Sequence, residues 1–271
     1  MAKRSSRRTR TPAMPPARSV VDRKIFIPER TGRALAKLGA AAPIRPAAAA
    51  AFRYEIVRTT EVDPYDRRIP RSAVPQIGAA VAPPSDDFAG TARKAAKLSI
   101  VDAKVEVFSD VGDLIATLPS KTAMKKHKPK ITTGPDSGRV SEENRKVRVR
   151  GFLYAASREG DNDYHLMVGR DPARTPRMYM TMEVSGLPPK GSKSLARLRN
   201  ARNAYKTFFK QTHLPGLTYD FYPKPIPVQV EGSLFFDMSH ANGQEPGPPS
   251  LHKDIPTIWE VHPITKITFE P

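Results

Sequence analysis

The order of strand-like and helix-like segments after about residue 141 most constrains the fold of this chain. Residues 147–154 alternate apolar positions such as Val147 and Leu153 with polar or aromatic ones, which predicts a half-buried strand. Further strands are predicted at residues 164–168, 178–184, 228–236 and 258–269, the last interrupted by Pro263. Residues 194–210 have the three- and four-residue apolar spacing of an amphipathic helix with a basic outer face, formed by Arg197, Lys206 and Lys210. We therefore expect a mainly β (α+β) fold with one helix between strands three and four.

This order resembles the five-stranded OB-fold, because Gly151 and Gly232 lie inside the first and fourth strands, where a small barrel bends. Staphylococcal-type nucleases share that barrel topology, but the chain has no match to their arginine and acidic catalytic pattern. Four segments also resemble an uncharacterised bacterial OB-like family: V-x-V-x-G-x-L from residue 147, D-x-D-Y-H-L from 161, G-S-L-F-F-D-x-x-H from 232 and W-E-V-H-P-I from 259. The resemblance implies an OB-like β-barrel domain over residues 141–271.

Charge and composition divide the remainder of the chain. Residues 1–50 contain 12 Lys/Arg and 2 Asp/Glu, a net charge of +10, whereas residues 201–271 have a net charge of −1. Because residues 1–51 have few aromatic side chains, we expect them to form a disordered basic arm. Residues 52–140 are predicted to form an extended arm and a small αβ lead-in, with strands at 52–57 and 100–108, helices at 86–98 and 110–118, and a lysine-rich linker at 121–139.

The amino-acid composition also limits which metal ligands, cellular location and partners we expect. The chain has no cysteine, so a metal ion would need His, Asp or Glu ligands. No stretch approaches the roughly 20 apolar residues that cross a bilayer, and we expect a soluble cytoplasmic protein without a membrane partner. A basic, acid-poor arm favours polyanions such as nucleic acid, or wraps a protein partner.

Four of the six histidines lie in or between acidic segments that an OB barrel would bring to one pole, where the loops joining strands one to two and four to five meet. These imidazole and carboxylate groups suit a divalent transition metal such as zinc or manganese. The predicted metal ligands are Asp163, His165, Asp237, His240 and His262. Glu260 and Asp161 are the candidate catalytic carboxylates, with Glu260 as general base. The alternatives are a metal-free acid/base site and hydrogen-bonded structural pairs.

A second candidate site lies on the predicted first strand. Arg148, Arg150, Phe152 and Tyr154 share one face, and Tyr179 on the third strand extends it. Cationic side chains that follow phosphates and rings that stack on bases are the features of single-strand binding. The sequence therefore favours a nucleic-acid-binding OB-like protein with a preference for single strands. The alternatives are a metal-dependent hydrolase, such as a nuclease, and a structural or assembly protein whose arm wraps a partner.

Overall fold

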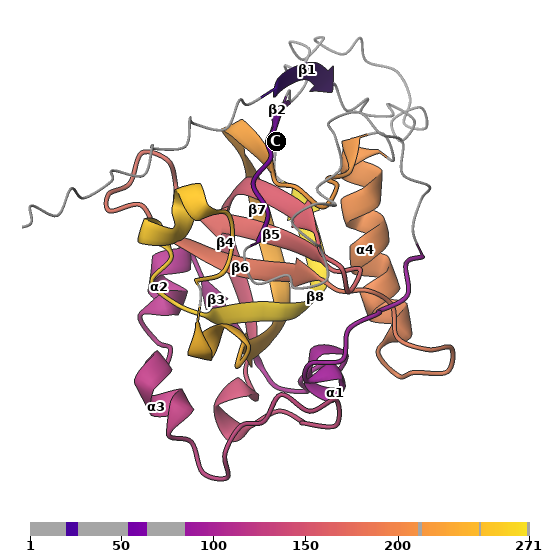
Figure 1. Cartoon of the computed structure of the whole chain (residues 1–271), viewed down its shortest axis with the longest axis vertical. Coiled ribbons are helices and arrows are strands. Elements are labelled where there is room, and N and C mark those ends of the chain that lie inside the picture. The colour runs from indigo at the N-terminus through magenta and orange to yellow at the C-terminus, as the bar shows by residue number, and fades with distance from the viewer. Residues whose placement is uncertain (1–19, 27–53, 64–84, 211–212, 244, 270–271) are drawn as a thin grey trace, which may run out of the picture.

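One mixed β-sheet organises the chain in this computed structural model (Figure 1). The structure describes residues 20–26, 54–63, 85–210, 213–243 and 245–269. Within these ranges the strands are β1 (Val20–Phe26), β2 (Tyr54–Arg58), β3 (Val105–Phe108), β4 (Lys146–Arg158), β5 (Tyr164–Gly169), β6 (Tyr179–Val184), β7 (Asp220–Phe236) and β8 (Trp259–Phe269). They pair in the order β1-β2-β7-β8-β6-β5-β4-β3.

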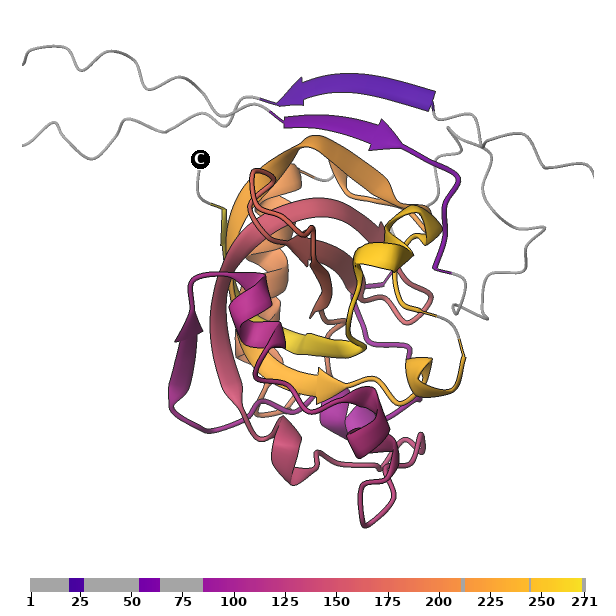
Figure 2. The ribbon, with the colours of Figure 1, turned by 90° about the vertical axis from the view of Figure 1, so that its left-hand side faces the viewer.

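Five of these strands pair in a ring, because β4 pairs with both β5 and β7. The pairings β4–β5, β5–β6, β7–β8 and β4–β7 are antiparallel, and a short parallel pairing joins β6 to β8. β3 runs parallel beside β4, whereas β2 and then β1 extend the sheet from β7. Figure 2 shows the strong curvature of the ring, with β1 and β2 on its outside. The five predicted strands and their order around the single helix are thus confirmed.

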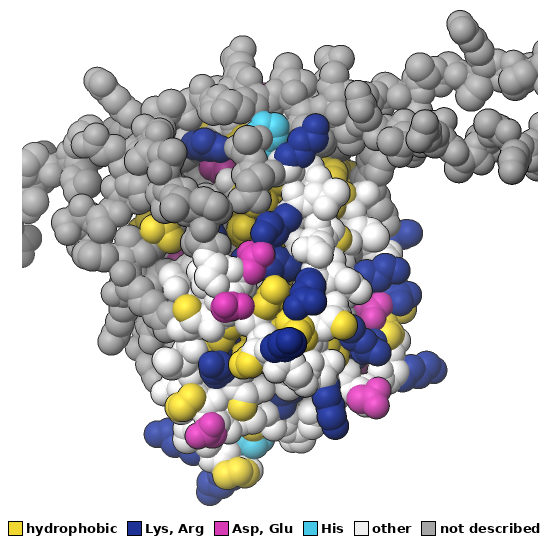
Figure 3. Space-filling model, turned by 90° about the vertical axis from the view of Figure 1, so that its right-hand side faces the viewer, with side chains coloured by type: hydrophobic (Ala, Val, Ile, Leu, Met, Phe, Trp, Pro, Cys, Tyr) yellow, Lys and Arg dark blue, Asp and Glu magenta, His cyan; other side chains and the backbone are white. Residues whose placement is uncertain are grey.

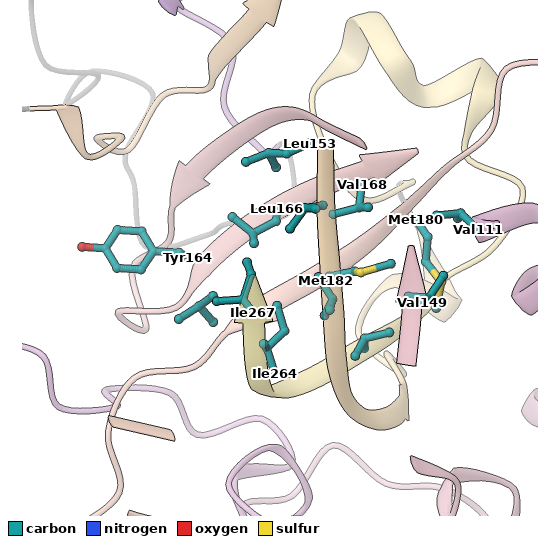
Figure 4. Packing of buried hydrophobic residues seen from close by; sticks show 14 of the residues in the cluster. Val111, Val149, Leu153, Tyr164, Leu166, Val168, Met180, Met182, Ile264 and Ile267 are labelled. Carbon is teal, nitrogen blue, oxygen red and sulfur yellow. The ribbon is translucent and has the colours of Figure 1, made fainter. Parts of the chain in front are cut away.

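The inner face of the ring is apolar because every second residue of the strands points inward. Val147, Val149 and Leu153 of β4 are buried there, whereas Arg150 between them is exposed. Leu166, Met182 and Ile267 from three other strands pack in the same cluster (Figure 4). This continuous core places the ring and its covering helix in one folding unit.

Two glycines allow the strands to approach one another closely. A Cβ atom at Gly151 would lie 2.8 Å from the carbonyl oxygen of Gly169, and one at Gly232 would lie 2.5 Å from the carbonyl oxygen of Pro263. Both contacts are with backbone, which cannot move aside as a flexible side chain would. The expected role of Gly151 and Gly232 in the bending strands therefore has a steric basis.

Helix α4 (Leu195–Phe209) follows β6 and packs on β8. It buries Leu198, Tyr205 and Phe209, whereas Arg197 is exposed, which confirms the amphipathic pattern. Figure 3 shows Lys and Arg side chains spread over the described surface on this side of the molecule. The other helices are short: α1 (Lys94–Lys97), α2 (Val111–Ile115), α3 (Lys121–Lys125) and the 3-10 turns η2 (Ser141–Glu143), η4 (His240–Asn242) and η5 (Pro249–Asp254). No helix in the described ranges is long and apolar enough to cross a membrane.

The region before residue 140 differs most from its predicted pattern. The helix expected at residues 86–98 is reduced to α1, because Arg93 takes a left-handed conformation (φ 48°) and buries its guanidinium 2.6 Å from Glu143. The strand expected at 100–108 begins only at Val105, and the predicted linker opens with α3, capped by Ser120. Within the predicted disordered arm, β1 is described as a strand, and the remainder of residues 1–51 lies outside the described residues.

Candidate metal centre

Strands β5, β6 and β8 place polar side chains side by side on the outer face of the ring. His165 pairs with Glu183 across β5 and β6, and Thr181 pairs with Glu260 across β6 and β8. The residues that alternate with them belong to the apolar core, so the polar side chains point away from it. His262 lies two residues beyond Glu260 and is also fully buried. The strand period therefore produces a buried polar face behind an apolar one.

Segments from three other parts of the chain add acidic and imidazole groups to this outer face. Asp63 follows β2, Glu159 and Asp163 lie in the turn between β4 and β5, and Asp237 and His240 follow β7. All are buried except Glu159, which is half-buried. The predicted convergence of the β4–β5 turn with the β7–β8 connection is therefore present, but on the outer face of the ring.

The structure arranges these side chains into four overlapping groups, and in each group three ligand atoms lie within 4.8 Å of one another. The groups are Asp63/Glu159/His165, Asp163/Glu183/His262, His165/Glu183/Glu260 and Asp237/His240/Glu260. Together they contain six carboxylates and three imidazoles, hereafter the carboxylate–histidine cluster. Among the described residues, no group contains two of the three histidines, so His165, His240 and His262 lie in different groups.

Each histidine of the cluster has one ring nitrogen close to a carboxylate. The Nδ1 atoms of His165, His240 and His262 lie 2.5 Å from oxygens of Glu159, Asp237 and Glu183 respectively. The Tyr219 hydroxyl also lies 2.8 Å from His165 Nδ1. Metal-binding histidines are commonly oriented in this way, because a carboxylate on one nitrogen fixes the ring and leaves the other nitrogen for the metal.

Several buried atoms of the cluster have no hydrogen-bond partner among the described residues. They include both carboxylate oxygens of Glu260, Oδ2 of Asp163, and Nε2 of His165 and of His262. A buried polar atom without a partner costs roughly 1–3 kcal/mol, and more if it is charged. Hydrogen-bonded structural pairs therefore account for only part of the cluster, and the remaining atoms are free for cations.

Lys97 is a buried cation at the edge of the cluster. Its Nζ lies 3.4 Å from Asp161 Oδ2, 3.9 Å from Asp163 Oδ2 and 3.7 Å from Glu183 Oε2. Burial opposes the charge on Lys97, but the surrounding carboxylates, with Glu183 the strongest, raise its pKa well above the usual range. Lys97 therefore stays charged and offsets one of the negative charges around it.

The electrostatics of the cluster disfavour bare carboxylates at some positions. Burial raises the pKa of Asp163 well above its usual range, and the charges of Asp161 and Glu183 raise it further. Burial also raises the pKa of Glu260, with Glu183 and Asp237 adding to the effect. Without a metal ion, the folded protein therefore favours protons on these two carboxyl groups.

Glu159, in the half-buried turn between β4 and β5, and His165 have shifted pKa values. Burial raises the pKa of Glu159 to about 7, although the charge of His165 opposes the shift. Burial alone would lower the pKa of His165, but Glu159 and Glu183 raise it to about 9. Proton exchange near neutral pH is thus concentrated at Glu159, where the cluster approaches the surface.

The predicted nucleic-acid residues lie on the outer face of β4 and beside it. Arg148 donates to Glu231 over 2.7 Å, and Arg150 is exposed. Tyr154 is half-buried: its hydroxyl donates to the carbonyl of Arg170 over 2.7 Å, and its ring packs edge-on against Tyr179 with centroids 4.9 Å apart. Phe152 is also half-buried. Their role in nucleic-acid binding stays a prediction.

Sequence reasoning missed four members of this polar region. Glu183 is the one acid in the strand segment Met-Thr-Met-Glu-Val, and a lone acid in such a strand is a usable signal. Glu159 directly precedes the acidic turn that was recognised. Asp63 and Lys97 reach the site only through long-range packing, which no local pattern encodes. Of the predicted catalytic pair, Glu260 lies inside two groups, whereas Asp161 belongs to none and contacts Lys97.

Comparisons with protein-family models, with curated proteins and with solved structures gave no match to this chain. The resemblance of its four segments to a bacterial OB-like family therefore stays a prediction.

Proposed function

We propose that this protein is a metal-dependent hydrolase whose carboxylate–histidine cluster binds divalent transition-metal ions such as zinc or manganese. One observation carries the proposal: six carboxylates and three imidazoles meet in a buried site, and several of their atoms lack hydrogen-bond partners. Mixed imidazole and carboxylate ligands suit these ions. Three protein ligands around one ion would leave a coordination position for water, and the ion would lower the pKa of that water and so supply hydroxide as the nucleophile for an ester.

Access from solvent supports hydrolysis over a purely structural ion. The side chains of Glu159 and Asp161 are 19% and 15% exposed, whereas those of His262 and Asp163 are fully buried. The β4–β5 turn is therefore the side on which water and substrate reach the cluster. Asp161 lies outside every metal group, and we assign it the role of general base. Lys97 supplies a positive charge beside it for a developing anion.

The position of the cluster also supports a ligand site. If the ring strands β4, β5, β6, β7 and β8 are numbered one to five, they pair in the order 1-2-3-5-4-1. Strands three (β6) and five (β8) are parallel. This arrangement favours an OB-like interpretation of the fold. OB-folds bind ligands on the face of strands two and three and on the loops that join strands one to two and four to five. The cluster occupies the outer face of β5 and β6, the β4–β5 turn and the β7–β8 connection.

Hydrolysis of bis(p-nitrophenyl) phosphate and p-nitrophenyl acetate tests the proposal with zinc-loaded and manganese-loaded full chain. Asp161→Asn should bind metal as the wild type does and lose activity by on the order of 100-fold, because it removes only the base. His262→Ala should lose metal and activity together, whereas His127→Ala, whose ring pairs with Glu142 outside the cluster, is the control. Bound metal without hydrolysis of either ester rejects the enzymatic role, and the absence of bound metal rejects the whole proposal.

Single-strand nucleic-acid binding is a second proposal, supported by the exposed Arg150 beside half-buried Phe152 on the outer face of β4. Arg148 on the same face is held by Glu231. The basic residues 1–50 carry no structural support, because most of them lie outside the described ranges.

A further inference from the structure

We infer that the carboxylate–histidine cluster binds three divalent cations in adjoining positions; this stoichiometry rests on the proposed metal dependence. Three of the four groups share no residue with one another: Asp63/Glu159/His165, Asp163/Glu183/His262 and Asp237/His240/Glu260. Each consists of two carboxylates and one imidazole. The three sets are built from segments distant in the sequence, and each offers the same ligand types and the same charge.

The fourth group joins the three sets at one centre. It takes His165 from the first set, Glu183 from the second and Glu260 from the third, and their ligand atoms lie within 4.8 Å of one another. A carboxylate has two oxygens and can bind two ions, so Glu183 and Glu260 are suited to bridge neighbouring positions. Within the described ranges, both side-chain oxygens of Glu260 lack hydrogen-bond partners, as bridging requires. The three positions are therefore adjacent.

Charge balance is compatible with three cations. The six carboxylates of the cluster carry six negative charges when all are ionised, and three divalent cations neutralise them. With fewer cations, some carboxyl groups keep their protons, as burial favours for Asp163 and Glu260. Full occupancy leaves no excess of either sign.

The distance between two ligand atoms fits coordination in one of the sets. Metal–ligand bonds of about 2.1 Å place two ligands of one ion roughly 3.0–3.6 Å apart. His262 Nε2 lies 3.5 Å from Asp163 Oδ2. In the first set, His165 Nδ1 lies 3.6 Å from Asp63 Oδ2 but is held 2.5 Å from Glu159, so the other ring nitrogen is the one available to a metal. In the third set, His240 Nδ1 is held by Asp237, and its Nε2 lies 3.8 Å from Asp63 Oδ1. Asp63 thus lies between the first set and the third.

The test is metal stoichiometry in the full chain. Protein stripped with chelator is reloaded with manganese, passed over a desalting column and analysed for metal per chain. The expected result is three equivalents, together with an electron paramagnetic resonance spectrum broadened by exchange coupling between neighbouring Mn²⁺ ions. Two or fewer equivalents, or a spectrum of isolated ions only, would overturn the three-cation inference. One equivalent with hydrolysis still leaves the proposed function intact, whereas no bound metal rejects both.

Single-set variants locate the positions. Asp63→Asn, Asp163→Asn and Asp237→Asn each change a residue that belongs to one set only, and each should bind two equivalents instead of three. Asp254→Asn is the matched control, because Asp254 pairs with Arg177 away from the cluster and should keep three. Circular dichroism identifies any variant that fails to fold. If a variant does not fold, the metal stoichiometry of the wild type alone supports or overturns the three-cation inference.

Discussion

The two faces of strands β5, β6 and β8 are equally buried and chemically opposite. On the inner face, Leu166 and Met182 pack in the continuous apolar core. On the outer face, His165, Glu183 and Glu260 lie among other charged groups, and the Glu260 carboxylate has no hydrogen-bond partner among the described residues. Burial favours the inner side chains by roughly 1.5–3 kcal/mol each, whereas it penalises the outer ones. The inner face is thus stable by itself, whereas the outer face needs compensation for its buried polar groups, which the proposed metal would supply.

Metal removal should have the largest effect, because the proposed metal would compensate the buried polar groups of the outer face. Binding to the native state alone contributes about 4 kcal/mol at a free metal concentration of roughly 1,000 times Kd. Chelation of the wild type should therefore lower its Tm by roughly 10 °C, measured by calorimetry. Restoration of the Tm by added zinc or manganese is the control. An identical Tm with and without chelator would show that both faces are stable without metal.

Leu166→Ala should destabilise the protein through the inner face alone. Loss of a fully buried leucine costs about 2–5 kcal/mol, because a cavity remains beside Val168 and Met182. Denaturant unfolding should show this loss to the same extent in metal-loaded and stripped protein, while metal content per chain stays unchanged. A variant that also loses metal would mean that the two faces are not independent.

Glu260→Gln, unlike Leu166→Ala, should stabilise the protein from which metal has been stripped. Because burial raises the folded-state pKa of Glu260, stability without metal falls as pH rises above the usual value of 4.5, and glutamine removes that loss. At pH 8 the stripped variant should be more stable than stripped wild type by about 1–3 kcal/mol. Glu245→Gln, which alters an exposed pair with Lys121, is the control. Lower stability of the stripped Glu260→Gln variant would mean that Glu260 is satisfied without metal.

The smallest expected effect concerns nucleic acid on the outer face of β4, away from the cluster. Arg150→Gln should reduce the slope of log affinity against log salt for single-stranded DNA by about one, as expected for one lost phosphate contact. Arg148→Gln tests the second cation of this face, whose guanidinium is held by Glu231. Equal slopes for both variants and the wild type would remove β4 from any binding surface.

The sequence predicts the inner face better than the outer one. Alternation in β4 and the spacing in α4 are local, so strand order, helix position and the roles of Gly151 and Gly232 could be inferred. The acidic segments around His165, His240 and His262 also indicate the region of the site. Glu183, together with Thr181, alternates with Met180, Met182 and Val184, so this strand carries a polar signal that the prediction overlooked. Asp63 and Lys97 join through packing over more than 60 residues, which a sequence pattern does not specify.

Anomalous diffraction from crystals grown with zinc, recorded on both sides of the zinc edge, tests the metal centre most directly. The account predicts strong anomalous peaks at coordination distance from Glu183, Glu260 and the histidine nitrogens, on the outer face of β5, β6 and β8. A map without a peak in the cluster, in which these side chains are bonded only to water and to one another, would contradict it.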